Sequence, residues 1–311
     1  MQAGDDGVPA TLALVVGTEG STYVRSGAMA LFGDDGRQVG WLSGGCLEPQ
    51  IAECARQALD AARIGWLEID TRDDEDLLSG SALGCRGRLR IALLPLPALR
   101  GWADAVRAWL RRQGALHLRL DRDGTLAVQV GDLRRAWSPG ADVPPWPDAE
   151  AATLAVPVPA AVAVFGAGPE TAMLLPLLRR LGWITHVIEC RPRWRVAADV
   201  ADHVLAASPP DAVASLAVER IEAALVMHHH FELDRETLVA LAGTDVGYVG
   251  LLGPRRRRDD LFKLLAAPER ERLRPRLRSP VGLALGGHGP EAIALSIAAQ
   301  LQAWRDGGEA P

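Results

Sequence analysis

Residues 164–171 read Val164-Phe165-Gly166-Ala167-Gly168-Pro169-Glu170-Thr171. They follow an apolar run that predicts a buried strand, and they lead into a predicted helix. Gly166 would permit a tight turn between the two, and Gly168 would let backbone approach a phosphate at the helix N-terminus. Strand, glycine turn and helix in this order are typical of the first unit of a Rossmann fold.

Two further features bear on whether this segment binds a dinucleotide. Thr171 stands where the third glycine is usual, whereas Glu189 follows Gly166 by 23 residues and ends the second predicted strand. An acid in that position can bind ribose hydroxyls of a dinucleotide. Gly166, Gly168 and Glu189 are therefore candidate cofactor-binding residues, and NAD(P) is a candidate cofactor. A Rossmann-shaped sheet that binds no dinucleotide is the open alternative.

The same alternation of strand and helix continues through residues 160–311. Predicted strands lie at 160–165, 184–189, 203–206, 223–227 and 247–251, and predicted helices at about 170–181, 234–242, 255–265 and 290–304. This alternation predicts right-handed crossovers and a doubly wound parallel sheet.

The N-terminal part has a different pattern. Residues 1–130 alternate predicted hairpin strands with helices at about 49–63 and 99–112, which predicts an α+β domain. Six prolines then cluster within residues 131–159 without sustained periodicity. Because proline fixes φ and removes a backbone donor, we expect a linker or extended arm there. The fold class is thus α/β, an N-terminal α+β domain followed by a Rossmann-like domain.

Composition narrows the function classes. The chain has 311 residues and a net charge of −5, yet residues 255–278 hold ten basic residues against four acidic ones. This distribution favours a small anionic ligand or an acidic partner over nucleic acid. No apolar run is long enough to cross a membrane, and the acidic N-terminus does not resemble a signal peptide, so we expect a cytoplasmic protein.

Cys46 lies in the run Ser43-Gly44-Gly45-Cys46-Leu47-Glu48-Pro49. Pro49 suits the first position of a helix, which places Cys46 in the loop that enters it. The positive end of the helix dipole favours thiolate, the form that binds metal or attacks electrophiles. A small buried cysteine in a packed turn is the alternative. We favour a functional thiol.

Cys85 has a similar setting, Leu83-Gly84-Cys85-Arg86-Gly87. Glycines bracket it, and neighbouring arginines would stabilise a thiolate or attract phosphate. Cys54, within a predicted helix, and Cys190, directly after Glu189, lack that context and are interpreted as structural. No CxxC pair occurs, so a structural zinc site is not expected.

Three further segments carry polar groups at predicted strand ends. Of His228-His229-His230, we expect one side chain to face the crevice at the carboxyl end of the sheet, because consecutive side chains alternate in direction. Gly253 lies in the loop before a helix predicted to start at Pro254, and Arg255 lies in the first turn of that helix, where a bound anion could offset the cost of the cations. Simple solvation of these arginines is equally consistent with the sequence. Residues 286–291 form another glycine loop before a helix.

Together these segments resemble the XdhC/CoxI family, accessory proteins for xanthine dehydrogenase and related molybdenum hydroxylases. The resemblance is carried by separated motifs in the right order. They are Gly20-Ser21-Thr22-Tyr23, Ser43-Gly44-Gly45-Cys46-Leu47-Glu48, Leu83-Gly84-Cys85-Arg86-Gly87, Phe165-Gly166-Ala167-Gly168, Tyr248-Val249-Gly250-Leu251-Leu252-Gly253-Pro254-Arg255, Pro280-Val281-Gly282-Leu283 and Pro290-Glu291-Ala292-Ile293-Ala294-Leu295-Ser296-Ile297.

The resemblance implies a cofactor-handling chaperone and not an enzyme that turns over a metabolite. Such a protein binds molybdenum cofactor (molybdopterin), promotes its sulfuration with a cysteine desulfurase, and delivers it to the apo-subunit of a molybdenum hydroxylase. Cys46 and Cys85 are then the candidate metal ligands. The other candidate cofactor-binding residues are Ser43, Gly44, Gly45, Glu48, Gly166, Gly168, Glu189, Gly253 and Arg255.

Two other functions compete with this interpretation. An NAD(P)-dependent oxidoreductase acting on a small substrate would explain the glycine turn and Glu189, although no general acid/base and tyrosine–lysine pair accompanies them. An interaction scaffold with an empty Rossmann crevice is the third. Neither membrane nor nucleic acid is an expected partner, and a second copy of the chain, giving a homodimer, is one more candidate.

Overall fold

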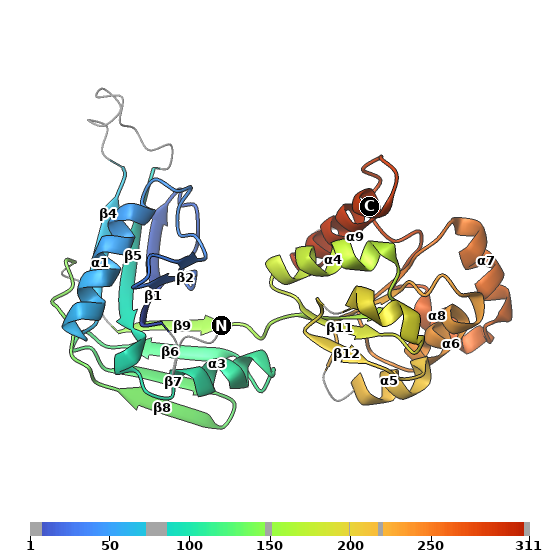
Figure 1. Ribbon diagram of the computed structural model, residues 1–311, viewed down its shortest axis with the longest axis horizontal. Coiled ribbons are helices and arrows are strands. Elements are labelled where there is room, and N and C mark those ends of the chain that lie inside the picture. The colour runs from blue at the N-terminus through green and yellow to red at the C-terminus, as the bar shows by residue number, and fades with distance from the viewer. Residues whose placement is uncertain (1–7, 73–85, 147–150, 199, 217–219, 308–311) are drawn as a thin grey trace. The chain divides into compact units, whose positions relative to one another are not determined.

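The computed structural model (Figure 1) describes residues 8–72, 86–146, 151–198, 200–216 and 220–307. The chain divides into two compact units, Met1–Val158 and Pro159–Pro311. Each unit has its own core. Within the described ranges, no helix is both long enough and apolar enough to cross a membrane.

The first sheet of the N-terminal unit is antiparallel, in the order β3-β2-β1-β5-β4. Its strands are β1 (Ala10–Gly20), β2 (Met29–Gly33), β3 (Gln38–Val39), β4 (Gly65–Asp70) and β5 (Gly87–Pro95). Helix α1 (Glu48–Ala61) covers one face, because Ile51, Ala55 and Ala58 recur at helical spacing and pack into the core of that face. Hairpin strands were predicted in this part of the chain, and β2 and β3 form one such pair; α1 confirms the helix predicted at about residues 49–63.

A second antiparallel sheet, in the order β8-β7-β6-β9, completes this unit. Its strands are β6 (Leu116–Leu120), β7 (Leu126–Val130), β8 (Leu133–Trp137) and β9 (Ala152–Val156), and they share a core with helix α3 (Trp102–Leu110). The segment 131–159, expected to be a linker, therefore contributes two strands to this sheet. Its prolines flank the strands and do not interrupt them, as edge positions and connections allow.

The C-terminal unit is a six-stranded parallel sheet in the order β12-β11-β10-β13-β14-β15. Its strands are β10 (Ala161–Phe165), β11 (Ile184–Ile188), β12 (His203–Leu205), β13 (Ala223–Val226), β14 (Tyr248–Leu251) and β15 (Leu277–Arg278). The predicted Rossmann-like doubly wound sheet is confirmed.

Helices cover both faces of this sheet. One face packs against α4 (Pro169–Arg180) and α9 (Pro290–Arg305). The other packs against α5 (Pro209–Leu216), α6 (Phe231–Ala242), α7 (Arg255–Leu264) and α8 (Ala267–Leu273). Strand order reverses between β10 and β13, and the loops that follow these two strands form the topological switch point. Doubly wound sheets bind ligands at such a point.

Candidate functional site

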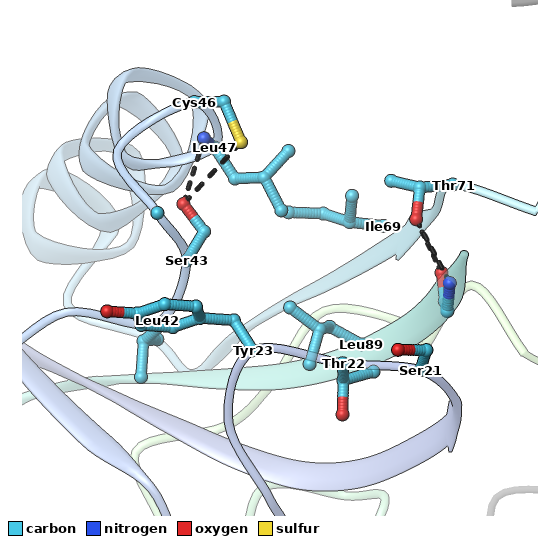
Figure 2. A pocket seen from close by; sticks show the side chains of 12 residues that line it. Ser21, Thr22, Tyr23, Leu42, Ser43, Cys46, Leu47, Ile69, Thr71 and Leu89 are labelled. Atoms are coloured by element: carbon cyan, nitrogen blue, oxygen red, sulfur yellow. Dashed lines mark hydrogen bonds between the residues drawn. The ribbon is translucent and has the colours of Figure 1, made fainter. Parts of the chain in front are cut away.

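The Ser43 hydroxyl organises the loop that contains Cys46. It donates a hydrogen bond to the Glu48 carboxylate. Its oxygen accepts hydrogen bonds from the N–H groups of Gly45 and Leu47, at 3.1 and 3.2 Å, and from the Cys46 thiol at 3.9 Å (Figure 2). Gly45 has a φ of +107°, which lets the backbone curl around the hydroxyl. One side chain therefore holds the whole turn before α1.

Glu48 fixes this loop from the first turn of α1. Its Oε1 accepts hydrogen bonds from the N–H groups of Leu42 and Ser43, at 3.1 and 2.8 Å. Burial acts to raise the pKa of Glu48, but the hydrogen bonds from Ser43 and Leu42 outweigh it and hold the pKa below its usual value. The buried carboxylate is thus engaged within the protein, and it positions the loop.

The Cys46 side chain is exposed and lines a pocket of the N-terminal unit. The pocket joins four segments that are far apart in the sequence (Figure 2). Its lining residues are Ser21, Thr22, Tyr23, Leu42, Ser43, Gly44, Cys46, Leu47, Ile69, Thr71, Gly87 and Leu89. An apolar floor with hydroxyls and one thiol around it suits a ligand that is part heterocycle and part soft metal centre.

Cys85, the second candidate thiol, lies outside the described residues. Gly87, two positions later in the sequence, lines the same pocket as Cys46. Its N–H donates to the Thr71 hydroxyl at 3.2 Å, and that hydroxyl donates to the Gly87 carbonyl at 2.9 Å. Cys54 is half-buried in α1, where burial raises the pKa of its thiol.

The glycine turn of the C-terminal unit uses its own N–H groups internally. Those of Gly166, Ala167 and Gly168 donate to the Ile188 carbonyl at 2.8 Å, to Glu189 Oε2 at 2.9 Å and to the Thr171 hydroxyl at 3.1 Å. Gly166 has a φ of +100°. A Cβ there would lie 2.5 Å from the His228 Cα, so glycine is required for the two loops to approach.

Glu189 has partners other than those the sequence suggested. The residue is fully buried, at 0% exposed. Oε1 accepts from the N–H and Nε of Arg191, and Oε2 accepts from Arg191 Nη2 and the Ala167 N–H, all within 2.8–2.9 Å. A carboxylate has about four acceptor positions, and all four are filled. Burial favours the neutral acid, yet these Arg191 hydrogen bonds lower the pKa of Glu189.

Glu170 and His229 meet beside Gly168 at the start of α4. His229 Nε2 lies 3.2 Å from Glu170 Oε2, and the two side chains are 50% and 9% exposed, respectively. His229 has a φ of +54°, an uncommon backbone conformation for a side chain of this size. Of the three histidines, His229 is the one that lies beside the glycine turn, and its facing a ligand crevice stays a prediction. His230 instead caps α6, accepting from the Leu233 N–H at 3.3 Å.

Asp234 bonds both His228 and Arg257, a set of contacts that the sequence did not predict. His228 Nδ1 lies 3.2 Å from Asp234 Oδ1, and Arg257 Nη2 donates to Asp234 Oδ2 at 2.6 Å. His228 Nε2 is buried and has no hydrogen-bond partner in the described part of the chain. The sequence offered one usable signal, an acid in the first turn of the helix that follows the histidines.

The four consecutive arginines at the start of α7 differ in whether they form ion pairs. Arg256, Arg257 and Arg258 each pair with an aspartate. Arg255 is exposed and, among the residues with described positions, has no side-chain partner. Gly253, with a φ of +123°, lies against the Arg257 side chain, and a Cβ there would come within 2.7 Å of it. The glycine thus leaves room for the Arg257 side chain, which pairs with Asp234.

The described residues do not form a metal site from side chains alone. Among them, no three or more histidine, cysteine, aspartate or glutamate side chains are grouped as a metal ion would require. Cys46 is then one candidate sulfur ligand for a metal that brings other ligands of its own, as a metal in an organic cofactor does.

Known proteins resemble this chain at both ends. The profile of the XdhC Rossmann domain matches residues 162–301, and that of the XdhC and CoxI family matches residues 3–70. A Bacillus subtilis (strain 168) protein, named as a probable subunit of xanthine dehydrogenase, is 27% identical over 320 residues, covering 96% of this chain and 93% of its own.

A crystal structure described as a xanthine dehydrogenase from Bacillus halodurans shares 28% sequence identity with this chain and has a TM-score of 0.76. It covers 97% of this chain and 93% of its own. The two profiles include the Cys46 loop and the glycine turn, and the similarities in sequence and structure extend over nearly the whole length. The chain therefore belongs to the XdhC and CoxI family.

Proposed function

We propose that this protein is an accessory protein of a xanthine-dehydrogenase-type molybdenum hydroxylase. It binds the molybdopterin-type cofactor, assists its sulfuration, and delivers it to the apo-hydroxylase. Family membership and the names of its relatives support the link to xanthine dehydrogenase. The proposed partners are a cysteine desulfurase, as sulfur donor, and the apo-form of the hydroxylase, and the proposed location is the cytoplasm.

The observation that carries the proposal is the exposed Cys46 thiol on a rigid loop at the wall of a pocket. Ser43 and Glu48 fix this loop through buried hydrogen bonds, so the thiol is presented without rearrangement. The cofactor, when bound, supplies a redox-active metal held by sulfur. Cys46 would contact that soft centre, and Cys85 is proposed as a second sulfur ligand.

Other candidate residues keep roles that fit their surroundings. Gly44 and Gly45 leave the loop free of side chains beside the thiol. Arg255 is a candidate contact for an anionic group, because the described residues give it no partner. Gly166, Gly168 and Glu189 shape the switch point, and their N–H and carboxylate groups bond within the glycine turn and its neighbours.

The test is cofactor retention after expression in a molybdate-replete host, measured as molybdenum and pterin per mole of purified protein. Cys46→Ala should fold normally and lose most of the cofactor, because alanine fits the turn but provides no sulfur. Cys54→Ala, which removes a half-buried thiol of the same unit, should retain it. Equal retention by Cys46→Ala and the wild type would refute the proposal.

An NAD(P)-dependent oxidoreductase is less well supported by the contacts. A dinucleotide needs free N–H groups at the glycine turn and free acceptors on the second-strand acid. Ala167 and Gly168 donate internally, and Glu189 has no vacant acceptor. We expect no thermal stabilisation by millimolar NADH or NADPH. A saturable stabilisation that Gly168→Asp abolishes would favour the oxidoreductase.

A further inference from the structure

The carboxylate of Glu170 is largely buried and has few hydrogen-bond partners within the protein. The residue is 7% exposed, and its side chain has one hydrogen-bond partner among the described residues, His229. Glu189, which follows β11 and bonds the N–H of Ala167 in the neighbouring glycine turn, receives four hydrogen bonds. Oε1 of Glu170 has no partner among the described residues and is not one of their fully buried unsatisfied atoms, so solvent reaches it. Water, or a ligand that brings N–H groups, can therefore donate to this otherwise buried carboxylate.

Phosphate is a poor match for this position. A Cβ on Gly168 would lie 2.7 Å from Glu170 Oε2, so the carboxylate lies where the fold would place a phosphate. The N–H groups of Ala167 and Gly168 are already used. The first turn of α4 stabilises the negative charge of Glu170 itself through the helix dipole. The switch point is built to accept hydrogen bonds.

We propose that Glu170, with His229 beside it, binds the 2-amino-4-oxopyrimidine edge of a ligand. This edge presents a ring N–H and an exocyclic amino N–H side by side, and two parallel donors match the two oxygens of one carboxylate. The half-exposed His229 ring offers a face for a planar heterocycle. The inference rests on the proposed cofactor-binding function, since pterins carry this edge. Guanine carries it too.

The test compares ligands that differ in this edge alone. Pterin and lumazine share the bicyclic ring, but lumazine has a carbonyl where pterin has the amino group. Guanosine and xanthosine form the corresponding nucleoside pair. Calorimetric titration of the full-length wild-type protein should give about tenfold or greater preference for the amino compound, because a carbonyl would face the carboxylate. A preference for pterin over lumazine identifies the ligand as a pterin. A preference for guanosine over xanthosine identifies it as a guanine compound.

Glu170→Gln should bring the two affinities of the discriminated pair within about twofold, because a carboxamide offers one acceptor and one donor. Glu291→Gln is the matched control. Gly289-Pro290-Glu291 repeats the Gly-Pro-Glu sequence at the start of α9, but Glu291 is exposed there. This variant should keep the wild-type preference. Circular dichroism and thermal melting verify that both variants fold, and His229→Asn, which tolerates positive φ, should weaken binding without abolishing the preference.

Lack of preference in the wild type, absence of binding of all four probes, or a preference that persists in Glu170→Gln would each overturn the inference. The cofactor-binding proposal has a separate readout, the molybdenum content of Cys46→Ala. If that content falls while Glu170→Gln still discriminates, the proposed function stands and the role of Glu170 does not.

Discussion

Replacing Glu48 with alanine removes the acceptor on which the Cys46 loop closes. Two buried N–H groups, those of Leu42 and Ser43, would lose a charged partner, and the Ser43 hydroxyl would lose its acceptor. A hydrogen bond to a charged group contributes about 1.5–3 kcal/mol. Allowing for partial relaxation, we expect local opening of this loop to become about 3 kcal/mol easier, which is roughly a hundredfold in the opening equilibrium.

Hydrogen exchange read by mass spectrometry measures that opening directly. Peptides covering residues 41–51 should exchange about a hundredfold faster in Glu48→Ala, whereas peptides from β10 should be unchanged. Glu53→Ala is the control, because Glu53 lies on the same helix but bonds exposed side chains only. Exchange in Glu48→Ala within about threefold of the wild type would show that the carboxylate does not hold the loop.

The same carboxylate gives the loop a pH dependence. Because the pKa of Glu48 is lowered in the folded protein, its stabilisation is complete above the unfolded-state pKa of about 4.3 and is lost as pH falls through the lower, folded-state value. Protection of the loop, corrected for intrinsic exchange rates, should decline with acidification in the wild type. Glu48→Gln should show no such decline over that acidic range.

Three further substitutions, one of them with a matched control, test the C-terminal unit. Gly166→Ala should lower its free energy of unfolding by about 3 kcal/mol, because the new Cβ would meet backbone at 2.5 Å, whereas Gly182→Ala, with a φ of +81° and nothing within 4 Å, should lower it by about 1 kcal/mol. Urea unfolding distinguishes them, and equal effects would contradict the packing argument. Arg257→Gln should lower the free energy of unfolding by about 3 kcal/mol, because the buried Asp234 would lose its cation. Arg255→Gln should leave stability unchanged yet reduce cofactor retention about tenfold at low salt; unchanged retention would make Arg255 a solvated residue.

The sequence predicted those features that depend on local periodicity. Apolar runs followed by glycine turns located the strands of the parallel sheet, because such strands are buried on both faces. Residues 131–159, expected to be a linker or extended arm, contain β8 and β9, whose five residues each are partly or fully exposed and give only a weak strand signal beside the prolines. Helices α5 and α8 have eight and seven residues, too few for a clear helical period.

The residue types of the site could be predicted from the sequence, but their hydrogen-bond and ion-pair partners could not. Glu189 lies at the expected strand end, but Arg191, only two residues later, fills its acceptors. Asp234 and Arg257 are 23 residues apart on different helices, and only the fold brings them together. The motif distinguished Arg255 from its neighbours, and the structure adds that those neighbours are paired.

Three buried glutamates differ in how many hydrogen bonds their carboxylates accept, and this difference distinguishes their roles. Glu189 accepts four hydrogen bonds and Glu48 three, and each binds the backbone of a loop, so removing either carboxylate should loosen structure. Glu170 is buried to a similar degree but has His229 as its one partner in the described chain. Enclosing a carboxylate is unfavourable unless donors compensate, and the protein supplies those donors at two of the three positions. At the third, Oε1 is accessible to water or to the proposed ligand, so Glu170→Gln should change the ligand preference and leave the stability of the fold nearly unchanged.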